Sequence, residues 1–135
     1  MKHYLYLLLL LSSLTACNIQ QQQIRKDWII LYKEYATYKS VCEITDNNLE
    51  KILWTKKDIS FSIHREILGS YADEADSIGR KYARNIKPLD VETEHDLYGM
   101  KPLFSECLKL YTSNYLDSLA NSAYKDYKYL NKKIK

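Results

Sequence analysis

Few side chains in this sequence have the types and spacing that catalysis or metal binding requires. His64 and His95 are the only histidines after Cys17, and neither has a second histidine or a cysteine at a zinc-ligand spacing. The stretch Asp73-Glu74-Ala75-Asp76 spells a helicase motif, but the three glycines of the chain form no phosphate-binding loop. We therefore expect no bound metal, no cofactor and no enzymatic activity.

The first of the three cysteines lies where covalent lipid attachment would occur. Lys2 precedes a short apolar run, and the run ends in Leu14-Thr15-Ala16-Cys17, which resembles the bacterial lipobox. In that motif the cysteine thiol receives a diacylglyceryl group. We expect residues 1–16 to be a lipoprotein signal peptide and Cys17 to be the lipidation site. The alternative is a soluble secreted protein cut near Ala16, with Cys17 as a spare thiol.

A lipidated cysteine would also fix the compartment. Two or three acyl chains hold a protein durably at a membrane surface. Asn18 follows Cys17 where inner-membrane lipoproteins often carry aspartate, so we expect a periplasmic protein anchored to the outer membrane. That space is oxidising and leaves Cys42 and Cys107 as an even pair, which predicts a disulfide between them. Two buried free thiols are the alternative.

Apolar and aromatic residues recur at helical spacing through most of the chain. One stripe starts near Ile24, and a capping box of Asn47 and Glu50 then favours a second helix. The alternating stretch Ile59-Ser60-Phe61-Ser62-Ile63 also fits a strand. Because no second strand is visible, we expect a helix there that ends at Gly69.

The second half of the chain continues the helical pattern. A stripe after Ser70 predicts a helix that Pro88 ends, and Ser113 is placed to cap the last helix. Between them, a helix with its true first turn near Pro102 is expected to bury Leu97, Met100, Leu103, Phe104, Cys107 and Leu108. Only three glycines and two prolines occur, so we predict an all-α fold, a small bundle of four to six helices stapled by one disulfide.

The chain is long enough for one domain. Residues 17–23 hold four consecutive glutamines and no apolar periodicity, which is typical of a flexible, lipid-anchored tether. The helical domain is expected over residues 24–130, and residues 131–135 form a basic tail. The net charge of +3 is too small for a strong field toward nucleic acid.

An acidic segment between two predicted helices is the candidate site for a protein partner. It lacks periodicity, so we expect an exposed loop with rigid ends. Its candidate partner-binding residues are Asp90, Glu92, Glu94, His95 and Asp96. The alternative is a solvated connector with no binding role.

The C-terminal part of the chain resembles a known family. Met100 to Tyr124 carries Cys107-Leu108-Lys109-Leu110-Tyr111, followed by Ser113 and by Leu116 with Leu119, and is similar to the type VI secretion amidase immunity protein family. Tyr38 and Cys42 look similar to an upstream tyrosine and cysteine of that family. The sequence departs from many members by having a lipobox and a longer charged loop.

The resemblance implies a periplasmic, all-α protein, often a homodimer, that blocks a cognate peptidoglycan amidase effector and so protects the producing cell. It also implies a disulfide between the two cysteines. An envelope lipoprotein of another class is the alternative: a lysozyme inhibitor, a conjugative exclusion factor or a structural assembly subunit.

Overall fold

The computed structural model describes the backbone of residues 2–133 and the side chains of residues 19–131. Within that range the fold is all-helical, with six helices and no strands, as the sequence predicts. They are α1 (Lys2–Ile44), α2 (Asn48–Thr55), α3 (Ser60–Leu68), α4 (Tyr71–Arg84), α5 (Leu103–Tyr111) and α6 (Asn114–Lys133). None of the described helices is long and apolar enough to cross a membrane.

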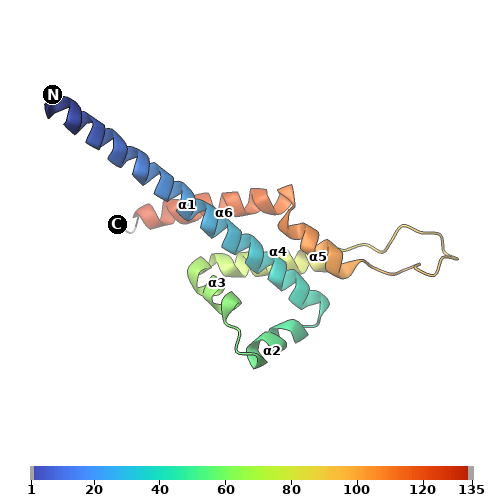
Figure 1. Cartoon of the computed structure of the whole chain (residues 1–135). Helices are drawn as coiled ribbons and strands as arrows, with labels where there is room; N and C mark the ends of the chain where they lie inside the picture. Colours follow the sequence, from blue (N-terminus) through green and yellow to red (C-terminus); the bar gives the residue numbers. More distant parts are fainter. Residues whose placement is uncertain (1, 134–135) are drawn as a thin grey trace.

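Helix α1 organises the molecule, because its C-terminal part contacts all five other helices. Figure 1 shows α6 alongside the middle of α1, and α2 and α3 as an arm that turns back from its end. The N-terminal half of α1 extends beyond the bundle. It includes the expected tether, whose described side chains are all exposed. The Cys17 side chain lies outside the described side chains.

The main core is a row of aromatic side chains on α1 covered by small residues. Trp28, Tyr32 and Tyr35 are buried at helical spacing, and the Trp28 ring contacts tyrosines of α4 and α6 at centroid distances of 5.2–5.7 Å. Helix α4 approaches α1 most closely at Gly79, where an added Cβ would lie 2.0 Å from the Ala36 carbonyl oxygen. The core is thus filled by aromatic rings of α1 and by the close packing of α4 against α1.

The helix boundaries confirm part of the sequence prediction. The alternating stretch at residues 59–63 is helical in α3, and Gly69, with φ of +58°, caps that helix as expected. Asn47 is the N-cap of α2 but makes no capping bond through its side chain. Its side-chain oxygen instead accepts a hydrogen bond from Arg80 at 2.9 Å. Tertiary pairing therefore replaces the predicted capping box.

The predicted disulfide is absent, since Cys42 and Cys107 are both buried free thiols. The Cys107 thiol interacts with Ser40, whereas the Cys42 thiol interacts with Tyr38 on its own helix face. Residues 40 and 42 lie about 200° apart around α1. Cys42 therefore lies on one side of α1, whereas Cys107 of α5 packs against the other side, at Ser40. They also belong to different core clusters. Counting cysteines could not show which side of α1 each one faces.

Helix α5 is shorter than expected and buries fewer of its apolar residues. It begins at Leu103 with Pro102 as its N-cap, so Leu97 and Met100 lie in the preceding loop and are exposed. Within α5, Cys107 and Leu110 face the core, while Phe104 and Leu108 are about half exposed. The prediction that all these side chains are buried is therefore wrong for four of them: Leu97, Met100, Phe104 and Leu108.

Candidate functional site

The segment between α4 and α5 is the longest stretch without helix in the described chain. Figure 1 shows it projecting from the bundle, at the end of the molecule opposite the N-terminus. Every side chain from Lys87 to Lys101 is exposed except that of Val91, which is half-buried. Ile86, at the start of the loop, packs in the smaller core cluster with Ala83 and Cys107. The loop therefore protrudes from a base that is packed into the bundle.

The loop has two extended legs and a tip of consecutive turns. The Leu89 amide donates to the Met100 carbonyl at 2.8 Å and ties the two legs together. At the tip, the His95 amide donates to the Glu92 carbonyl at 3.0 Å, and the Tyr98 amide to the His95 carbonyl at 2.9 Å. The Leu97 amide donates to His95 Nδ1 at 3.1 Å. His95 therefore shapes the tip as well as being exposed on it.

Four predicted binding residues on the loop carry unpaired negative charge. Asp90, Glu92, Glu94 and Asp96 are exposed, and none forms an ion pair within the part of the chain that the structure describes. Glu43, in the bundle, is different. Hydrogen bonds from Arg84 and Arg80 lower its pKa. The loop carboxylates are thus available to cations of another molecule.

The same loop also displays apolar side chains, two of which, Leu97 and Met100, the sequence pattern had placed in a buried helix. Leu97, Tyr98 and Met100 follow the acidic residues and are all exposed, Tyr98 by 58%. Gly99 between them has φ of +77°, a conformation that favours glycine. Tyrosine and methionine are enriched in protein interfaces, and a charged edge beside apolar anchors is typical of such surfaces. The glycine between apolar residues was the only sequence signal for a turn here.

A concave surface of about 440 Å³ lies where this loop meets the bundle. Its lining includes Tyr82 of α4, Ile86 and Pro88 from the start of the loop, and Pro102 and Glu106 from the start of α5. Two prolines at the two ends of the loop restrict its backbone. The concave surface therefore lies at the base of the loop and extends the surface that a partner can contact.

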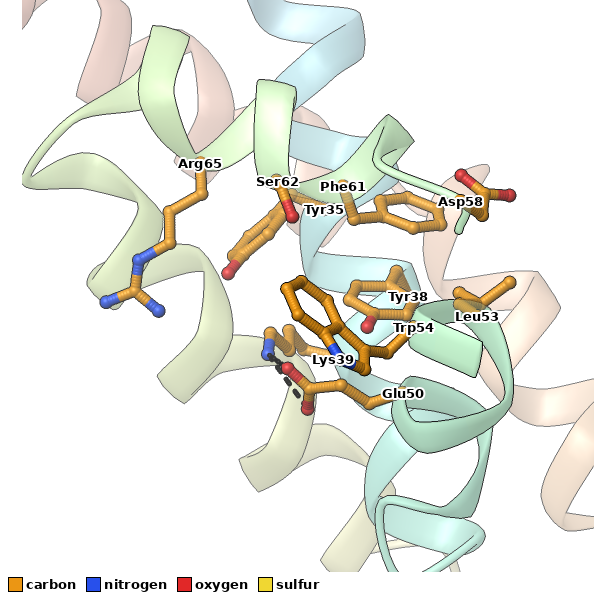
Figure 2. A pocket seen from close by; sticks show the side chains of 10 residues that line it. All are labelled: Tyr35, Tyr38, Lys39, Glu50, Leu53, Trp54, Asp58, Phe61, Ser62 and Arg65. Carbon is orange, nitrogen blue, oxygen red and sulfur yellow. Dashed lines mark hydrogen bonds and ion pairs between the residues drawn. The ribbon is translucent and has the colours of Figure 1, made fainter. Parts of the chain in front are cut away.

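A second, smaller pocket of about 100 Å³ lies between α1, α2 and α3. Figure 2 shows Lys39 and Glu50 joined in it beside the ring of Trp54, while the rings of Tyr35, Tyr38 and Phe61 line the rest of the pocket. Lys39 Nζ lies 3.3 Å from Glu50 and 3.6 Å from Asp76, and its side chain is almost fully buried. Two carboxylates neutralise this cation, so the pocket is a structural ion cluster, and its volume is below that of ordinary ligand sites.

An apolar groove of about 740 Å³ runs between α5 and the α2–α3 arm, with α1 as its floor. Phe104 and Leu108 form one wall, and Leu49, Leu53 and Phe61 form the other. At its rim His64 Nε2 contacts Glu34 at 2.7 Å, and His64 Nδ1 contacts the Ser60 carbonyl at 2.6 Å. These contacts hold the imidazole against α1 and α3.

The bundle thiols are poorly placed for nucleophilic chemistry. Burial raises the pKa of the Cys42 and Cys107 thiols, against hydrogen bonds that favour the thiolate. Raised pKa and burial both work against a reactive thiolate. Among the described residues, no three His, Cys, Asp or Glu side chains gather as metal ligands.

Comparison of the chain with family models, with curated proteins and with solved structures finds no match.

Proposed function

We propose that the chain is a periplasmic, lipid-anchored immunity protein that binds a peptidoglycan amidase effector of a type VI secretion system and blocks its cleft with the loop between α4 and α5. The observation that carries this proposal is the protruding loop, which presents four unpaired carboxylates beside exposed Leu97, Tyr98 and Met100. The motif around Cys107 supports the choice of family, and the lipobox supports the location.

The loop suits the inhibition of an enzyme cleft. Its tip is narrow, and the turns and the Leu89–Met100 bond order it before it binds, so little conformational entropy is lost on insertion. Negative charge steers it toward a basic rim and raises the association rate, while the apolar residues supply contact area and slow dissociation. A cleft enzyme blocked in this way cannot bind peptidoglycan.

The position of the loop fits an anchored inhibitor. It lies at the end of the molecule opposite the N-terminus (Figure 1). If Cys17 holds the protein at a membrane, the loop points into the periplasm, where a delivered effector arrives. Anchoring also raises the local concentration of inhibitor near the wall.

The first test measures binding of the chain to an amidase encoded beside its gene, by calorimetry and by peptidoglycan digestion. Tight binding that stops digestion supports the proposal. Replacing Asp90, Glu92, Glu94 and Asp96 by their amides should reduce the association rate by tenfold or more at low salt and weaken its salt dependence, as steering by charge requires.

A control matched in charge replaces four exposed carboxylates outside the loop, Asp27, Asp46, Glu66 and Asp126, by their amides. This variant should bind like the unmodified chain. Equal loss of binding in both variants would show that net charge, and not the loop, drives association. Absence of binding by the unmodified chain would remove the amidase proposal.

A further inference from the structure

The arm formed by α2 and α3 exposes apolar side chains outside both core clusters. Trp54 is 76% exposed, more than any other large apolar side chain that the structure describes. Ile59, Ile63 and Ile67 recur every four residues along α3 and are each about half exposed. We name these four residues the arm face. Trp54 and Ile59 line one surface hollow together with Lys57 and Asp58, and contiguous exposed apolar groups mark interaction sites.

Cations surround the Trp54 end of the arm face. Lys51, Lys56 and Lys57 are exposed, and none forms an ion pair within the described side chains. Of the neighbouring acids, Glu50 binds Lys39, whereas Asp58 accepts only the neutral Ser60 amide at 2.8 Å and keeps its negative charge. Three lysines against the one carboxylate of Asp58 leave the turn with a net positive charge next to an indole ring.

The turn that displays these groups has a defined shape. Lys57 has φ of +57°, and its amide donates to the Trp54 carbonyl at 3.0 Å, while the Asp58 amide donates to the Leu53 carbonyl at 2.9 Å. These bonds close the end of α2. Trp54, Lys56 and Lys57 are consequently presented together by backbone hydrogen bonds.

We propose that the arm face docks on an anionic lipid surface. Tryptophan favours the boundary between headgroups and acyl chains, isoleucines enter the acyl region, and lysines extend toward anionic headgroups. Each lysine near such a surface increases binding about fivefold. Lysine is depleted in protein interfaces, so three unpaired lysines beside the tryptophan favour lipid over a protein partner. The inference does not depend on the amidase proposal.

The test uses tryptophan fluorescence of the full chain reconstituted in phosphatidylcholine vesicles, with or without added phosphatidylglycerol. The chain has two tryptophans, and Trp28 is buried with 4% exposure, so a change in quenching by acrylamide, a neutral quencher that the vesicle charge does not repel, reports on Trp54. Phosphatidylglycerol should shield Trp54 from acrylamide and allow its quenching by brominated lipid. The Trp54→Phe variant should lose both effects.

Charge variants separate lipid docking from general attraction. Lys56→Gln and Lys57→Gln should each lower the equilibrium constant for shielding of Trp54 about fivefold. The matched variants Lys81→Gln and Lys87→Gln, which are exposed elsewhere, should leave it unchanged. Equal acrylamide access with and without phosphatidylglycerol would overturn the proposal. Shielding of Trp54 only after a partner protein is added would also overturn it and identify the arm face as a protein interface.

Discussion

Replacing Gly79 by alanine should destabilise the protein although alanine is the better helix former. The new methyl carbon would lie 2.0 Å from the Ala36 carbonyl oxygen and 3.0 Å from the Ser40 amide nitrogen. Both contacts are to backbone of α1, which cannot rotate away as a side chain can. Helices α1 and α4 must therefore separate by roughly 1 Å or more to restore ordinary contact distances.

The magnitude follows from two opposed terms. Glycine to alanine in a helix interior gains about 1 kcal/mol, while overpacking a close contact costs about 1–3 kcal/mol and occasionally more. Separation also loosens Ala72 and Ala75, which are fully buried on the same face of α4. We expect a net loss of about 1–2 kcal/mol, because the clash is with backbone and its cost lies in the upper part of that range.

Urea unfolding of the two proteins measures this loss. With an ordinary slope, the midpoint should fall by about 1 M for the Gly79→Ala variant. Ser77→Ala is the control, since Ser77 is exposed on the same helix, and its stability should change by less than about 0.5 kcal/mol. A Gly79→Ala protein as stable as the unmodified one would refute the close approach of α1 and α4.

Two further predictions concern the cysteines and the acid limit of stability. Peptide mapping after alkylation in denaturant without reductant should find Cys42 and Cys107 both alkylated, and a cross-linked peptide pair would contradict the free thiols. The Glu43 pKa is lowered from 4.5 by Arg84 and Arg80, so its stabilisation is complete above that pH and is lost as pH falls through the lower folded value. Glu43→Gln should therefore lower the free energy of unfolding by about 1 kcal/mol at neutral pH. It should also make this free energy fall less steeply as the pH is lowered. An unchanged dependence on acid pH would assign acid unfolding to other groups.

The fold class could be predicted because helical periodicity is a local property. Trp28, Tyr32 and Tyr35 recur at helical spacing, and these residues form the buried row of α1. The α3 segment was ambiguous by pattern alone, and the lack of a possible partner strand decided it correctly. Periodicity identifies a face, but it does not say whether another helix covers that face.

That limit explains two of the errors, the burial predicted for α5 and the disulfide. Phe104 and Leu108 make an apolar stripe on α5, yet they border an open groove because α5 packs through Cys107 and Leu110 instead. The prediction of a disulfide was wrong for a similar reason, since spacing along the chain does not determine how α1 and α5 are rotated against each other. The acidic loop was predictable in position from its lack of periodicity, whereas its apolar tip was assigned to a helix that begins only at Leu103.

The two proposed surfaces use different physical signals and can fail independently. The loop combines negative charge with apolar tip residues, whereas the arm face combines positive charge with Trp54. Removing the loop carboxylates should change binding to an amidase and leave Trp54 shielding unaltered. Removing Lys56 and Lys57 should do the opposite. If the anchored protein also docks through the arm face, docking reduces rotation about the lipid tether and limits the directions in which the loop can point. Variants of the arm face should therefore weaken protection in cells while leaving amidase binding in solution intact.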